Sequence, residues 1–179
     1  VAGGLAIRAP RRGVVVGGVV ILLVAGWTGL RLDVDLDELA ASADKPMFRG
    51  LSARQNPGTV IETRWSAFAR SDLVDRTGDT GYNLYLDGAA GSYLFRFNGD
   101  LRRLYFLRGE APAFPYFVSR RERALVIGPG GGVDVLFGLM TGWRQIDGVE
   151  VNADAVRMVR QRPDYSGRIY DRSNVDIHL

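Results

Sequence analysis

The sequence predicts an α/β protein in which an apolar N-terminal segment precedes two differently patterned folded parts. Three observations indicate this fold class: an uncharged run near the start, short alternating strands in the middle, and a glycine loop between an apolar strand and a helix. The 179 residues include no Cys and one His, which excludes disulfides, thiolate metal sites and clusters of histidine ligands. The net charge of +3 is too small to indicate nucleic acid, so we expect no nucleic-acid partner.

Residues 1–31 have the character of a membrane anchor. The run 13–30 reads GVVVGGVVILLVAGWTGL and carries no charge. A helix of that length spans about 27 Å, close to a hydrocarbon core of about 30 Å. Three arginines precede the run and Arg31 follows it, although a cleavable signal peptide or a buried helix is an alternative. We therefore expect one transmembrane helix, the lipid bilayer as a partner, and a bacterial inner-membrane protein whose remaining part is cytoplasmic.

A polar, irregular linker is expected over residues 32–57, followed by a small β-rich module over residues 58–118. Alternating residues, many β-branched or aromatic, predict four strands, at 59–65, 71–75, 82–88 and 92–100. Asp-Gly and Asn-Gly pairs predict turns between or after these strands, and a helix is compatible with 101–109. Seven aromatic residues are expected to form the core of this sheet, with a ligand slot as the alternative: Tyr82, Tyr85, Tyr93, Phe95, Phe97, Tyr105 and Phe106.

Residues 119–179 are predicted to form half of a Rossmann-like nucleoside-binding domain with about three parallel strands. A short apolar strand, 124–127, leads directly into the loop GPGGG, and residues 134–140 resume with helical spacing. A loop of this kind lets backbone N–H groups approach a ligand, and glycine supplies the positive φ that the turn requires. Later elements are a strand at 145–151, a helix at 153–161 and a strand near Val175.

Glu150 lies at the tip of the second of these strands, at roughly the 20-residue distance from the loop at which an acid binds ribose hydroxyls. The glycines follow the pattern G-x-G-x-G and lack the third-glycine spacing of a dinucleotide fingerprint. The pattern therefore favours a nucleoside of the S-adenosylmethionine type over NAD. A tight structural turn and a surface glutamate are the alternative interpretation.

At these motifs the chain resembles a known family. The segments ALVIGPGGGVDVLFGL and IDGVEVN resemble the first two motifs of the spermidine synthase-like group of class I S-adenosylmethionine-dependent transferases. Over about residues 45–179 the chain is similar to the membrane-fused bacterial members. The resemblance implies binding of S-adenosylmethionine or decarboxylated S-adenosylmethionine as the donor, and group transfer to a small amine.

The same resemblance implies roles for individual residues. It places Gly128, Gly130 and Gly132 at the amino-acid or aminopropyl end of the donor. Glu150 would hold the ribose and Val151 would pack on the adenine. Aminopropyltransferases carry an acid where this chain has Gly131, whereas Asp134 follows three residues later on the helix; we include both as candidate donor-binding residues.

The resemblance further implies that the chain is C-terminally truncated. The catalytic residues of the family are expected beyond Leu179, so we expect no turnover from these 179 residues and an unpaired edge on the first parallel strand. No metal is expected. His178 and the acids Asp164, Asp171 and Asp176 are interpreted as structural or solvated. A homodimer is a further prediction. The alternative functions are an S-adenosylmethionine-dependent methyltransferase and a non-catalytic, membrane-tethered nucleoside-binding subunit.

Overall fold

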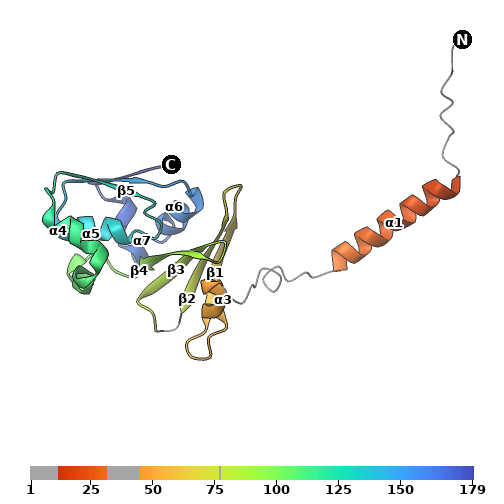
Figure 1. Cartoon of the computed structure of the whole chain (residues 1–179), viewed down its shortest axis with the longest axis horizontal. Coiled ribbons are helices and arrows are strands. Elements are labelled where there is room, and N and C mark those ends of the chain that lie inside the picture. The colour runs from red at the N-terminus through yellow and green to blue at the C-terminus, as the bar shows by residue number, and fades with distance from the viewer. Residues whose placement is uncertain (1–11, 32–44, 77) are drawn as a thin grey trace, which may run out of the picture. The chain divides into compact units, whose positions relative to one another are not determined.

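The computed structural model describes residues 12–31, 45–76 and 78–179 (Figure 1). The chain divides into two units, Val1–Ala41 and Ser42–Leu179. The first unit contributes one described helix, and the second contains both sheets.

The helix α1, Arg12–Arg31, requires a correction to the predicted fold class. Among the residues that the structure describes, none of the helices combines the length and the apolar character that crossing a bilayer requires. The predicted transmembrane helix over 13–30 is therefore wrong, as is the predicted inner-membrane localisation. The lipid bilayer as a partner, which was inferred from the same segment, stays a prediction.

The middle of the chain forms a four-stranded antiparallel sheet in the order β1-β2-β3-β4. Its strands are β1 (Gly58–Trp65), β2 (Arg70–Arg76), β3 (Gly81–Leu86) and β4 (Ala90–Phe95). The β3–β4 hairpin closes through Asp87 and Gly88, both with positive φ, as an Asp-Gly turn predicts. The short helix α3 (Pro46–Leu51) packs against the sheet through Met47, which shares a buried cluster with Val74 and Tyr85. Of the segment predicted as a linker, residues 32–44 lie outside the described residues.

The connection to the second sheet is a run of short helices. Residues Leu101–Gly109 form the 3₁₀ helix η1, and η2 (Ala111–Ala113) and α4 (Phe114–Val118) follow. Asp100 caps η1 by accepting a hydrogen bond from the Arg102 N–H at 3.1 Å. The 3₁₀ geometry buries Leu104 and Leu107, three residues apart, and leaves Tyr105 and Phe106 exposed. These two aromatic side chains are therefore not in the sheet core, where the sequence predicted them.

The C-terminal part is a β-α-β-α-β unit with a three-stranded parallel sheet in the order β5-β6-β7. In chain order its elements are β5 (Arg123–Ile127), α5 (Val133–Thr141), β6 (Gln145–Val149), α6 (Ala153–Arg160), α7 (Pro163–Ser166), η3 (Ile169–Asp171) and β7 (Val175–His178). Val126 and Ile146 are buried, whereas Leu125 and Ile127 on alternate positions of β5 are exposed. Among the described strands, β5 pairs only with β6, so its outer edge carries no strand partner there.

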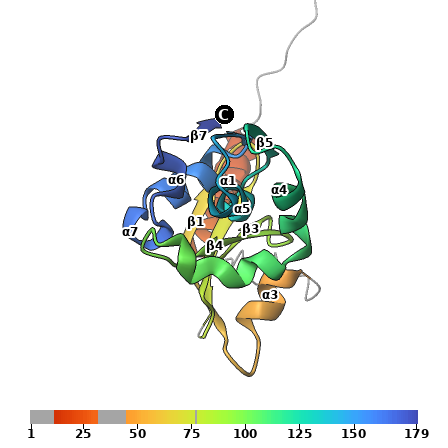
Figure 2. The ribbon, with the colours of Figure 1, turned by 90° about the vertical axis from the view of Figure 1, so that its left-hand side faces the viewer.

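The two sheets share one core. Leu94 of β4 and Phe97 just beyond it belong to the same buried cluster as Val135 of α5 and Ile146 of β6. In Figure 2, β4 lies against α5 and α7. The rings of Tyr82 and Tyr165 stack across this boundary, with centroids 4.0 Å apart. The antiparallel sheet is therefore a packed wall of the unit that holds the glycine loop.

Candidate functional site

The glycine loop joins β5 to α5 and lies against the antiparallel sheet. Gly128, Gly130 and Gly132 have φ values of +68°, +53° and +93°, a conformation that favours glycine. A Cβ at Gly130 would lie 2.8 Å from the Ser92 hydroxyl. A Cβ at Gly131 would overlap the backbone of Tyr93. Packing on β4 therefore explains the absence of side chains at the centre of this loop.

Four backbone N–H groups of the loop have acceptors within the protein. Gly128 donates to the Val149 carbonyl at 2.8 Å, and Gly132 donates to the Pro129 carbonyl at 2.7 Å. Gly130 donates to a Glu150 carboxylate oxygen at 3.0 Å, and Gly131 donates to the Ser92 hydroxyl at 2.9 Å. A pyrophosphate cradle needs such amides to point at the ligand. The arrangement therefore disfavours a phosphate-bearing ligand at these four amides.

Glu150 follows β6 directly and is 6 % exposed. One carboxylate oxygen accepts the Gly130 N–H, and the other accepts the Asn152 N–H at 2.9 Å. Its own N–H donates to the His178 carbonyl at 2.9 Å, which fixes the strand end against β7. Backbone donors stabilise a buried carboxylate because each supplies a charge-assisted hydrogen bond. Glu150 thus joins the glycine loop to the start of α6.

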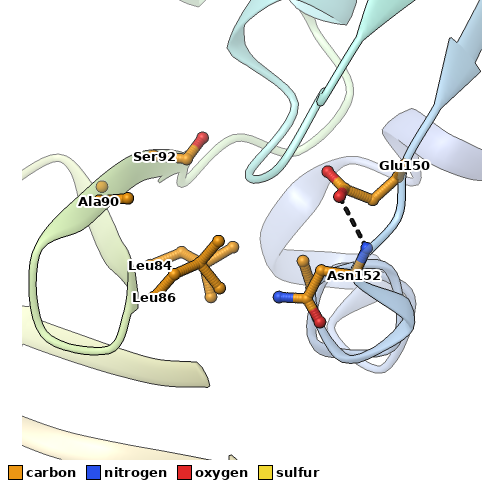
Figure 3. A pocket seen from close by; sticks show the side chains of 8 residues that line it. Leu84, Leu86, Ala90, Ser92, Glu150 and Asn152 are labelled. Carbon is orange, nitrogen blue, oxygen red and sulfur yellow. Dashed lines mark hydrogen bonds between the residues drawn. The ribbon is translucent and has the colours of Figure 1, made fainter. Parts of the chain in front are cut away.

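A small cavity of about 80 Å³ lies beside Glu150. Figure 3 shows Leu84, Leu86 and Ala90 on one wall and Glu150 on the opposite wall. The other lining residues are Gly91, Ser92, Asn152 and Ala155. Pockets that enclose a whole small molecule usually measure about 300–1,000 Å³. The cavity therefore has room for part of a nucleoside and combines an apolar surface with a buried carboxylate.

Asn152 connects the same region to the antiparallel sheet. Its side-chain oxygen caps α6 by accepting the Asp154 N–H at 3.1 Å, and its amide group donates to the Ser71 hydroxyl of β2 at 2.9 Å. Sequence reasoning missed Asn152 and Ser92 as site residues. The N-cap position before 153–161 was a signal for Asn152. No local pattern marks Ser92, because only the packing of β4 on the loop brings it there.

Tyr170 of η3 also contacts the glycine loop. It is almost fully buried, and its hydroxyl donates to the Gly130 carbonyl at 2.7 Å. Burial raises the pKa of the Tyr170 hydroxyl above its usual value, and the nearby Glu150 carboxylate adds to the rise. The hydroxyl therefore stays a neutral donor at ordinary pH.

Other residues considered from the sequence lie elsewhere. Asp134 accepts a hydrogen bond from the Tyr116 hydroxyl at 3.3 Å and lines a groove beside β5 rather than the Glu150 cavity. Burial, followed by this carboxylate, raises the pKa of Tyr116. Val151 is 71 % exposed, next to Glu150. The His178 side chain lines a different groove, with its Nε2 3.6 Å from Asp147.

In the part of the chain that the structure describes, no three acids or histidines gather in a geometry that could hold a metal ion. Asp171 instead forms an ion pair with Arg160, and Asp176 accepts a hydrogen bond from Gln145.

Comparison with solved structures finds similarity to spermidine synthases. A spermidine synthase in complex with the transition state analogue AdoDATO has a TM-score of 0.49 and 20% identity, over 67% of this chain and 39% of that chain. The spermidine synthase from Thermotoga maritima has a TM-score of 0.47 and 20% identity, with the same two coverages of 67% and 39%. A probable spermidine synthase from Corynebacterium glutamicum has a TM-score of 0.45 and 17% identity, over 68% of this chain and 44% of that chain.

This chain thus covers 39–44% of the length of these solved structures. No protein-family model matches it, and no curated protein matches it either.

Proposed function

We propose that the cavity beside Glu150 binds the nucleoside part of S-adenosylmethionine or of decarboxylated S-adenosylmethionine, as a donor for group transfer to a small amine. The observation that carries this proposal is the buried Glu150 carboxylate, held at the end of β6 by the N–H groups of Gly130 and Asn152. A carboxylate offers about four lone-pair directions, and the two backbone donors use two of them. Both oxygens therefore keep capacity for the hydroxyl groups of a ribose.

The loop amides support a nucleoside without phosphates. All four of the N–H groups described above already have protein acceptors, so a pyrophosphate at those amides would have to break internal hydrogen bonds. The apolar wall formed by Leu84 and Leu86 suits the uncharged faces of a nucleoside. The small-amine acceptor is proposed from the family resemblance of the loop and Glu150 motifs alone.

Methyl transfer from intact S-adenosylmethionine is a second candidate, and the geometry of Gly131 favours it. Aminopropyltransferases of the family place an acid at this position, but here any side chain would overlap the Tyr93 backbone. Asp134 does not replace that acid in the cavity, since it lies in the groove with Tyr116. Without an acid at the donor's amino end, a carboxylate-bearing donor meets less electrostatic repulsion.

Calorimetric titration of the 179-residue chain with four compounds tests these proposals: S-adenosylmethionine, its decarboxylated form, adenosine and NAD. We expect saturable binding of at least one of the two donors and of adenosine, with NAD weaker than adenosine. Tighter binding of intact S-adenosylmethionine would favour the methyl donor, and tighter binding of the decarboxylated form would favour aminopropyl transfer. NAD binding tighter than both donors would contradict the proposed ligand class.

A further inference from the structure

Ser92 of β4 touches the glycine loop at two adjacent residues. Its hydroxyl accepts the Gly131 N–H at 2.9 Å. A Cβ added at Gly130 would lie 2.9 Å from the Ser92 Cβ and 2.8 Å from the Ser92 hydroxyl oxygen. In Figure 3, Ser92 lies on the wall of the cavity opposite Glu150. The loop therefore passes between a serine of the antiparallel sheet and the glutamate that directly follows β6 of the parallel sheet.

These two contacts act on neighbouring amides of one short loop. Gly130 donates to Glu150, and Gly131 donates to Ser92. The Gly130 N–H belongs to the 129–130 peptide plane, which meets the 130–131 plane at the Gly130 Cα, where φ is +53°. The Tyr170 hydroxyl fixes the carbonyl of Gly130, which belongs to the same peptide plane as the Gly131 N–H. Ser92 and Tyr170 thus hold the two ends of one peptide plane.

We propose that Ser92 is a positioning residue through which the antiparallel sheet sets the conformation of the glycine loop, and so the presentation of Glu150 to a ligand. The ligand part of this inference rests on the proposed nucleoside function. Losing the Ser92 acceptor lets the 130–131 peptide plane rotate, and because glycine tolerates other backbone angles, the Gly130 Cα shifts with it. The 129–130 plane shares that Cα, so its N–H moves relative to Glu150 and the hydrogen bond weakens. The carboxylate then loses one of its two backbone donors and becomes free to turn away from the cavity.

The test compares Ser92→Ala with Ser92→Thr and with a matched control, Ser66→Ala. Ser66 also accepts backbone N–H bonds through its hydroxyl, from Phe68 and Ala69, but it lies in the β1–β2 turn. Amide hydrogen exchange by NMR reports on Gly130 and Gly131, and calorimetry reports the affinity for S-adenosylmethionine. We expect Ser92→Ala to speed exchange at both glycines and to weaken affinity about tenfold, the scale of one hydrogen bond. Ser92→Thr, which keeps the hydroxyl, should restore both values, and Ser66→Ala should change neither.

A purely structural role for Ser92 predicts a different pattern. It would lower the melting temperature of Ser92→Ala while leaving Gly130 exchange and ligand affinity at wild-type values, and that result overturns the inference. Faster exchange at Gly131 alone also overturns it, because the coupling to Gly130 would be absent. If the wild-type chain binds no nucleoside, the proposed function fails, and Gly130 exchange in Ser92→Ala then decides the coupling by itself.

Discussion

The Glu150 carboxylate accepts a hydrogen bond from the backbone N–H of Gly130 at 3.0 Å. The contact joins the loop after β5 to the residue after β6, so one hydrogen bond connects the ends of the two parallel strands. The glycine loop is therefore held by Glu150 as well as by the antiparallel sheet. Because Glu150 is buried, the hydrogen bond from Gly130 decides whether the carboxylate keeps a fixed position in the wall of the cavity.

Gly131→Ala should destabilise the fold because its Cβ would overlap the Tyr93 carbonyl on β4. Overpacking of this kind costs about 1–3 kcal/mol in free energy of unfolding. Urea unfolding measures the change. Gly109→Ala is the matched control, since no atom lies within 4 Å of its added Cβ, and it should stay within about 0.5 kcal/mol of wild type. Equal stability of the two variants would show that the loop does not pack on β4 as described.

Asn152→Ala should lower the free energy of unfolding by about 1–3 kcal/mol. The variant removes the cap of α6 and leaves the fully buried Ser71 hydroxyl without its donor. A double-mutant cycle with Ser71→Ala isolates the contact between the two side chains, and we expect the double variant to lose less than the sum of the single losses. Strict additivity would argue against the hydrogen bond between α6 and β2.

Tyr170 should make stability depend on pH in the alkaline range. Burial raises the pKa of its hydroxyl in the folded state above the ordinary value of 10.0. Below pH 10 both states hold the proton; above it the unfolded chain releases the proton first, so folding stability falls as pH rises. Tyr170→Phe should weaken this fall, and it should also lower stability at pH 7 by about 1–3 kcal/mol, because the Gly130 carbonyl loses its donor. Urea unfolding at pH 7, 10 and 11 measures both effects, and an unchanged alkaline slope would contradict the account.

The loop and its acid could be predicted from sequence because each depends on local pattern. An apolar strand, a glycine run and a helical spacing define the β5–α5 turn, and Glu150 follows from the distance to the next strand tip. The antiparallel strands were predicted from alternation and from turn residues such as Asp87-Gly88. Each of these signals is contained within a few neighbouring residues.

Long-range contacts escaped sequence reasoning. Ser92 reaches Gly131 across 39 positions and Asn152 reaches Ser71 across 81, so no periodicity links the partners. Helical spacing placed Asp134 in the first turn of α5 but could not show that its carboxylate meets Tyr116. The transmembrane prediction rested on length and lack of charge over 13–30, and the described helices do not support it.

Calorimetric titration of Glu150→Gln with S-adenosylmethionine and its decarboxylated form, beside wild type, tests the central claim most directly. Glutamine keeps one side-chain oxygen acceptor but loses the charge, and hydrogen bonds to charged groups contribute about 1.5–3 kcal/mol each. Glu122→Gln is the control, because Glu122 is exposed, forms an ion pair with Arg144 and precedes β5 at the strand end opposite the glycine loop. We predict at least about tenfold weaker binding in Glu150→Gln and wild-type binding in Glu122→Gln. Wild-type affinity in a folded Glu150→Gln variant would contradict the assignment of Glu150 as the nucleoside-binding acid.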